Sequence, residues 1–105
     1  MPAIPNNIVP IKVLSEGAFG SFASSGLMFS VPSQPGYVII QYTIRGAAIT
    51  VRLDGGVPTA GANGTDIQPG TYIEVFSPAV ANAITAIQNG GTATGWYRIL
   101  QAVNV

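Results

Sequence analysis

The sequence contains no cysteine and no histidine among its 105 residues. Without cysteine there can be no disulfide framework and no thiol redox chemistry. Without histidine the chain by itself cannot build a Ser-His-Asp or Cys-His nucleophile system, and the usual nitrogen and sulfur ligands of zinc are missing too. These two absences exclude the most familiar catalytic centres. We therefore expect a protein that is not an enzyme, with no catalytic residues, no metal ligands and no cofactor.

Charged residues are also scarce in this sequence. The chain has four Lys or Arg and four Asp or Glu, which is 8% of its residues and a net charge of zero, against about 25% in an ordinary soluble domain. Eight charges cannot cover the surface that a domain of this size exposes, and neutral surfaces tend to associate. The chain is either a soluble domain covered by Ser, Thr and Asn, or a protein covered by its partners in an assembly. The high mean hydropathy favours the assembly.

The few basic residues are also too scattered for nucleic-acid binding. They are Lys12, Arg45, Arg52 and Arg98, whereas contact with a phosphate backbone uses clusters of basic side chains. No run approaches the ~18 apolar residues of a membrane-spanning helix, and the first residues lack the basic region of a secretory signal. We expect no nucleic-acid partner, no membrane, and a chain that remains in the cytoplasm or enters a particle assembled there.

What the sequence does contain is a regular spacing of chain breakers. Thirteen glycines and eight prolines recur along the chain, so few segments run uninterrupted for more than about ten residues, which suits short strands better than helices. Residues 37–45, 48–54 and 71–76 alternate apolar and polar side chains, as half-buried strands do. Weaker strand signals cover residues 8–14, 22–24, 26–31, 83–88 and 92–103. A helix over residues 78–88 is the alternative to one of them, and residues 55–70 read as a turn-rich connection.

These patterns predict an all-β fold, either a compact β-sandwich or a jelly-roll-like barrel of about seven or eight short strands. The expected core residues are Val38, Ile40, Tyr42, Ile44, Ile49, Val51, Leu53, Ile73, Val75, Tyr97 and Ile99.

The first ten residues differ from the rest because prolines stand at positions 2, 5 and 10. Proline lacks a backbone N–H and holds its predecessor extended, so we expect an extended N-terminal arm over residues 1–10 and a single β-domain over residues 11–105. The arm also contains apolar side chains, which would pack either on its own domain or on a neighbouring subunit. The predicted interface residues are Ile4, Pro5, Ile8, Val9, Tyr72, Phe76 and Trp96.

The four carboxylates offer little acid–base chemistry. Asp54 precedes Gly55-Gly56 and is expected to form an Asx-type turn. Asp66 reads as a loop residue, and Glu74 sits in a strand opposite Ile73 and Val75, where Arg52 or Arg98 could pair with it. A paired-carboxylate glycosidase and a calcium site on Asp54, Asn63 and Asp66 are the residual chemical alternatives.

Trp96 and Tyr97 form the largest aromatic group. In a strand Trp96 shares a face with Arg98, and Tyr97 points the other way. Trp96 is either a core or subunit-interface aromatic or a platform on which a sugar stacks.

A series of short motifs fills the second half of the chain. They are Ile49–Ala60 (ITVRLDGGVPTA), Gly64, Ile67–Ile73 (IQPGTYI), Ala83–Ile87 (AITAI), Gly91–Thr94 (GTAT) and Tyr97. Together, over Ala48–Leu100, they resemble small virion proteins of tailed bacteriophages. The resemblance implies a small β-domain of the phage particle and points to a head decoration (cement) protein, a class that often forms trimers on the capsid surface. The same pattern could also serve in a tail or fibre.

Composition and resemblance lead to the same functional expectation. We expect a structural virion protein that binds and stabilises a phage capsid as a homo-oligomer, most simply a homotrimer. Its partners would be further copies of itself and the major capsid protein, on the surface of a capsid assembled in the bacterial cytoplasm. The alternative is a receptor- or carbohydrate-binding module of a tail or fibre.

Overall fold

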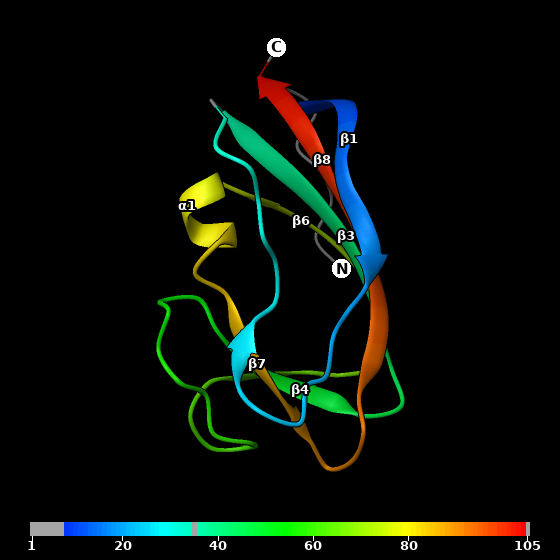
Figure 1. Ribbon diagram of the computed structural model, residues 1–105, viewed down its shortest axis with the longest axis vertical. Coiled ribbons are helices and arrows are strands. Elements are labelled where there is room, and N and C mark those ends of the chain that lie inside the picture. Colours follow the sequence, from blue (N-terminus) through cyan, green and yellow to red (C-terminus); the bar gives the residue numbers. More distant parts are fainter. Residues whose placement is uncertain (1–7, 35, 105) are drawn as a thin grey trace.

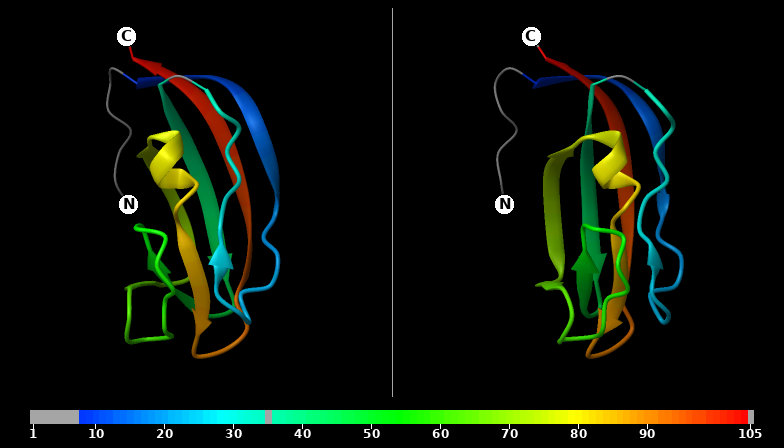
Figure 2. Two further views of the ribbon diagram at one scale, coloured as in Figure 1. Left: turned by 60° about the vertical axis from the view of Figure 1, so that its left-hand side comes forward. Right: turned by 90° about the vertical axis from the view of Figure 1, so that its left-hand side faces the viewer.

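Two four-stranded antiparallel sheets pack face to face in this computed structural model, which describes residues 8–34 and 36–104 (Figures 1 and 2). Sheet A contains, in spatial order, β1 (Ile8–Ala18), β8 (Thr94–Asn104), β3 (Tyr37–Arg45) and β6 (Gly70–Phe76). Sheet B contains β2 (Gly26–Leu27), β7 (Thr85–Asn89), β4 (Ala48–Arg52) and β5 (Thr65–Ile67). The predicted all-β class and sandwich architecture are confirmed.

Short connections carry the chain from one sheet to the other. Gly46 and Ala47 join β3 to β4, and Gln68 and Pro69 join β5 to β6. A single helical turn, α1 (Pro78–Ala81), lies between β6 and β7, where the Ser77 hydroxyl accepts a hydrogen bond from the Val80 amide. The helix considered over residues 78–88 is thus limited to one turn, because the chain becomes strand β7 from Thr85.

The core between the sheets is built by alternate residues of the central strands. Seven of the predicted core residues are buried and pack together there: Val38, Ile40, Tyr42, Ile44, Ile49, Val51 and Ile99. Tyr97 is half-buried against them. Six aromatic rings form a connected network in this core, and the centroids of contacting rings are 5.2–5.9 Å apart: Phe19, Phe22, Phe29, Tyr97, Tyr42 and Tyr72.

Strand β6 has the opposite orientation to the one that its alternation predicts. Tyr72 is the register partner of Tyr42, and Phe76 that of Val38, so both aromatics face the core and pack against it. Ile73 and Val75 consequently lie on the outer face of sheet A, and their assignment to the inter-sheet core is wrong. Both faces of this edge strand contain large apolar side chains, so periodicity by itself could not choose between them.

Leu53 is a second correction to the predicted core. Strand β4 ends at Arg52, and the chain then enters the turn at Asp54 and Gly56, which leaves the Leu53 side chain 54% exposed. The alternating sequence pattern continues to Leu53, but the strand ends at Arg52, so the prediction of Leu53 as a core residue is wrong.

The predicted arm boundary at residue 10 falls inside a strand. Ile8, Val9 and Pro10 belong to β1 and pair with Asn104, Val103 and Ala102 of β8. The strand tolerates Pro10 because β1 is an edge strand, where a missing N–H breaks no ladder on its open side. Residues 1–7 of the predicted arm lie outside the described residues.

Gly95 is required where β8 passes close to β3. A Cβ at this position would collide with the Thr43 carbonyl oxygen and would approach the Phe19 ring to 3.1 Å. Because Gly95 has no Cβ, β8 can lie against β3 and the Phe19 ring can pack beside it at the same position.

Candidate functional site

Exposed apolar side chains gather at the end of sheet A where β1 begins and β8 ends. We call five of them the apolar end: Val9, Ile11, Val13, Tyr37 and Val103. Ile11 and Val13 are 53% and 51% exposed, although both lie in a strand. Val9 and Val103 are register partners, and Tyr37 is the partner of Ala102, next to Val103 in the chain. Val13 and Tyr37 lie on the outer face of sheet A, and Val9 and Val103 on the opposite face, so the exposed apolar side chains surround this end of the sheet on both faces.

Three residues of the apolar end, Val9, Ile11 and Val13, belong to an open edge strand. β1 is the outermost strand of sheet A, so its outer row of backbone N–H and C=O groups has no partner strand among the described residues. Natural edges of this kind are usually blunted by proline, lysine or bulges. Pro10 and Lys12 stand in β1, with register shifts between Pro10 and Lys12 and between Val13 and Ser15. These features disfavour unlimited strand pairing but leave the apolar side chains available for contact.

The predicted interface residues are distributed over several places. Ile4 and Pro5 lie outside the described residues. Ile8 is half-buried in β1 and Val9 is part of the apolar end. Tyr72 and Phe76 face the inter-sheet core and are only partly accessible, and Trp96 is exposed on the outer face of sheet A. Of the five predicted interface residues that the structure describes, only Val9 belongs to the apolar end, and these five do not lie together on one surface.

Sequence reasoning missed Ile11, Val13, Tyr37 and Val103 as surface residues. A signal was present, because every residue from 8 to 14 except Lys12 is apolar, so the apolar residues do not alternate with polar ones. Such a run contributes apolar side chains to both faces of a strand. A strand of this kind at a sheet edge must expose some of them.

The outer face of sheet A divides into two halves along the strand direction. Rows read from the register show Val13, Leu100, Ile39 and Val75 side by side towards the apolar end. The next two rows contain five polar side chains, Glu16, Arg98, Gln41, Thr43 and Thr71, together with Ala18, Trp96 and Ile73. We call this part of the face the polar half. Trp96 is 46% exposed there.

All four carboxylates accept hydrogen bonds, and each has a different donor. Glu16 pairs with Arg98 at 2.8 Å and Asp54 with Arg52 at 2.6 Å. Asp66 accepts from the Thr50 hydroxyl at 2.7 Å, and Glu74 accepts from the Tyr42 hydroxyl at 2.9 Å. The predicted pairing of Glu74 with Arg52 or Arg98 is therefore wrong, since both arginines are held by closer carboxylates.

The Asp54 turn forms as predicted. Asp54 Oδ1 accepts a hydrogen bond from the Gly56 amide at 2.9 Å, which is an Asx-type turn. The hydrogen bonds from Arg52 and from the Gly56 amide together lower the pKa of the Asp54 carboxyl to about 2. Arg52 also donates to the Asn63 side chain at 3.2 Å, so a guanidinium joins two of the three residues considered for calcium. Within residues 8–34 and 36–104 no group of three acidic side chains could hold a metal ion.

Glu74 and Tyr42 form a partly buried polar contact between neighbouring strands. Burial, reinforced by the negative charge of Glu74 and the hydrogen bond to it, raises the pKa of the Tyr42 hydroxyl well above its ordinary range. The Tyr42 hydroxyl therefore keeps its proton and donates a hydrogen bond to the Glu74 carboxylate, which faces inward from β6.

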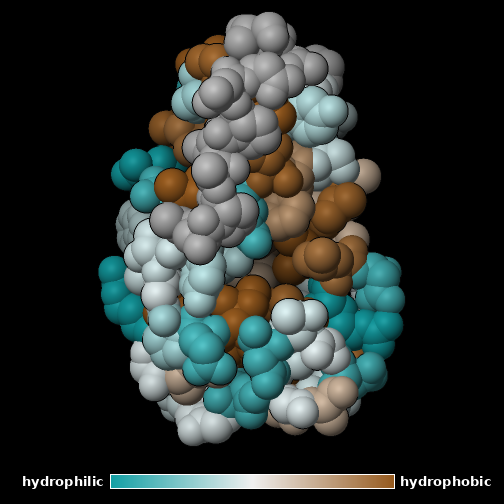
Figure 3. All heavy atoms as spheres, turned by 180° about the vertical axis from the view of Figure 1, so that it is seen from behind, coloured by the Kyte–Doolittle hydropathy of each residue, from teal (hydrophilic) through white to brown (hydrophobic). Residues whose placement is uncertain are grey.

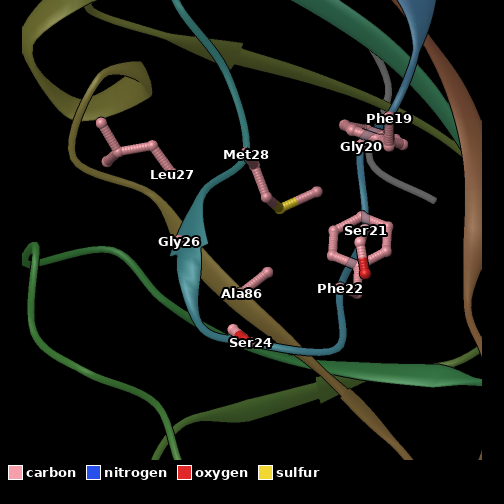
Figure 4. Close-up of a pocket in the computed structure, with 9 residues that line it drawn as sticks. All are labelled: Phe19, Gly20, Ser21, Phe22, Ser24, Gly26, Leu27, Met28 and Ala86. Carbon is pink, nitrogen blue, oxygen red and sulfur yellow. The ribbon is translucent and has the colours of Figure 1, made fainter.

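The two open sides of the sandwich are lined by apolar side chains. Beside β2, a small cavity of about 70 Å³ lies between Phe19, Phe22, Met28 and Ala86 (Figure 4), where Met28 extends toward the segment of Phe19–Phe22 and Leu27 points the other way. A wider groove of about 400 Å³ continues along Phe29 and Tyr97.

On the opposite side, a hollow of about 200 Å³ lies between Val51, Leu53, Ile67 and Phe76. Seen from behind, hydrophobic surface gathers in the upper and central parts of the molecule, and hydrophilic surface occupies the margins and much of the lower part (Figure 3). The described residues include no helix that is long and apolar enough to cross a membrane.

Comparison of the chain with protein-family models, with curated proteins and with solved structures finds no match.

Proposed function

We propose that this chain is a structural protein of a phage particle, which binds the capsid surface and stabilises it as a homotrimeric decoration protein. Its partners in this proposal are further copies of itself and the major capsid protein. The observation that supports the proposal is the apolar end of sheet A, where five large apolar side chains are exposed, three of them on the open edge strand β1.

The remaining surface fits the same role because it offers little charge to oppose contact. Of the eight charged side chains, Arg52 and Asp54 neutralise each other, as do Arg98 and Glu16. A patch with apolar side chains and few charges resembles the centre of a protein interface more than an ordinary surface.

Repetition on a symmetric particle explains how a small contact surface on each copy can be enough for stable binding to a capsid. A stable interface buries ~1,200–2,000 Å² in total, and association itself costs several kcal/mol. A trimer held together through its apolar ends would present three equivalent further surfaces to the capsid, which raises the effective concentration for the second and third contact. Stabilisation then results from linking neighbouring capsid subunits, without any chemical step.

The test is to charge the apolar end. The double variant Ile11→Lys, Val13→Lys replaces two half-exposed side chains, so the sandwich should stay folded. Light scattering at micromolar concentration should show a trimer for the parent chain and a monomer for the variant. Cosedimentation with tailed-phage heads assembled without this chain should show binding weakened by about tenfold or more, as for loss of central interface residues.

A matched control uses exposed aliphatic side chains elsewhere. Leu27 and Val57 are 66% and 68% exposed, and the double variant Leu27→Lys, Val57→Lys should assemble and bind like the parent. The proposal fails if the parent chain is a monomer that does not sediment with heads. It also fails if charging Ile11 and Val13 has no greater effect than the control.

A further inference from the structure

The one tryptophan of the chain lies in the polar half of sheet A, away from the apolar end. Trp96 and Ala102, at the apolar end, are six residues apart on β8, which corresponds to about 20 Å along a strand. Contacts at the apolar end therefore do not account for a Trp side chain that is 46% exposed. An indole is the largest apolar side chain and is usually well buried unless it meets a partner.

A hollow beside Trp96 gives this surface its shape. In the register, Trp96 is the partner of Thr43, and Arg98 is the partner of Gln41. These four residues and Tyr42 line a hollow of about 120 Å³. That is the space of roughly four water molecules. It fits one or two ring substituents, while the ring that bears them would lie on the exposed indole.

The side chains around the hollow supply hydrogen bonds of both kinds. The Gln41 amide can donate and accept, and Thr43 shares a hydrogen bond of 2.9 Å with Thr71 across the neighbouring strand. Arg98 uses its Nε to donate to Glu16 at 2.8 Å, so its two terminal amino groups are outside that contact. Donors and acceptors thus surround one flat aromatic face.

The charges in this region favour a ligand with hydroxyl groups over an anion. Glu16 neutralises Arg98 directly. Arg45 lies one row further along β3, opposite Thr94, and does not line the hollow. A phosphate or carboxylate would therefore meet a guanidinium that is already paired, whereas hydroxyl groups can bond to Gln41, Thr43 and Arg98 without displacing Glu16.

We propose that the polar half of sheet A binds a neutral saccharide. The apolar C–H face of one pyranose ring would stack on the Trp96 indole, whose face carries partial negative charge. Ring hydroxyl groups would enter the hollow and bond to the Gln41 amide, the Thr43 hydroxyl and the terminal amino groups of Arg98. This inference does not depend on capsid binding, because the two surfaces share no residue.

The experiment is a titration of the full chain with gluco-, manno- and galacto-configured neutral disaccharides. Because Trp96 is the only tryptophan, its fluorescence and its indole N–H resonance report on this site alone. We expect a saturable change of both signals with at least one disaccharide, together with shifts of the Gln41 side-chain amide. Calorimetry should show binding weakened by about tenfold or more in Trp96→Ala, which removes the stacking surface.

The matched control is Tyr37→Ala, since Tyr37 is an exposed aromatic on the same sheet face but at the apolar end. It should bind the disaccharide like the parent chain. If Trp96→Ala does not fold, Arg98→Gln tests the hydrogen bonds instead and should also weaken binding. The inference is overturned if no neutral disaccharide changes the Trp96 signals, if only acidic sugars do, or if Trp96→Ala binds as well as Tyr37→Ala.

Discussion

The Tyr42 hydroxyl on β3 donates a hydrogen bond of 2.9 Å to Glu74 Oε2 on the neighbouring edge strand β6. Both side chains point between the sheets, and the Tyr42 ring stacks on Tyr72 with centroids 5.3 Å apart. A carboxylate that faces inward would be costly without such a donor. The pair therefore fixes the orientation of β6, with Tyr72 and Phe76 inward and Ile73 and Val75 outward.

Removal of the donor should destabilise the fold. Tyr42→Phe keeps the ring but leaves Glu74 without its hydrogen bond, at an expected cost of about 1–3 kcal/mol in the free energy of unfolding. Urea unfolding at neutral pH measures this cost. Thr43→Val, on the same strand but on the outer face, is the control and should have a smaller effect. An equal loss in both variants would show that the Tyr42–Glu74 bond contributes nothing of its own.

The same pair should make stability depend on alkaline pH. The pKa of Tyr42 is raised in the folded state above its ordinary value of 10.0, so its contribution is fully present below about pH 10 and is lost as pH rises towards the folded pKa. Unfolding measured at about pH 8 and about pH 11 should therefore show a larger loss for the parent chain than for Tyr42→Phe. Parallel pH curves for the two proteins would contradict this prediction.

Ile99 and Leu53 test the position of the core. Ile99 is fully buried between the sheets, so Ile99→Ala should cost about 2–5 kcal/mol. Leu53→Ala should change stability by no more than about 0.5 kcal/mol, because the side chain is largely in water. Thermal or urea unfolding of both variants checks this, and a comparable loss for Leu53→Ala would place that side chain in a core after all.

Gly95 should not tolerate a side chain. The Cβ of Gly95→Ala would collide with the Thr43 carbonyl oxygen, and separating the strands should cost about 1–3 kcal/mol or more. Gly26→Ala is the matched control, since no atom lies within 4 Å of its Cβ position. Melting temperatures should therefore fall for Gly95→Ala alone.

Asp54 should titrate at unusually low pH. NMR titration of its carboxyl should give a midpoint of about 2, and Arg52→Gln should raise this midpoint towards the ordinary 3.8. Because the folded pKa is lowered, the stabilisation from Asp54 is present above the ordinary pKa and is lost as pH falls through the folded value. Arg98→Gln, which removes the other exposed ion pair, should leave the midpoint of Asp54 unchanged.

The sequence by itself determined the class of fold and much of its core. Breakers at short intervals excluded long helices. The alternation of residues 37–45 and 48–54 correctly predicted six buried side chains of the central strands, Val38, Ile40, Tyr42, Ile44, Ile49 and Val51, but it did not predict that Ile39 and Thr50 on the other faces are buried as well. The Asp54 turn was also predictable, because an aspartate before two glycines forms it from local geometry.

Only the tertiary structure decided what happens at the edges. Strand β6 has apolar residues on both faces, so its orientation depended on its register with β3 and on the partner that Tyr42 offers to Glu74. The exposure of Ile11 and Val13 followed from the place of β1 at the margin of sheet A. Alternation along a chain shows that a strand has two faces, but burial depends on neighbours that are distant in sequence.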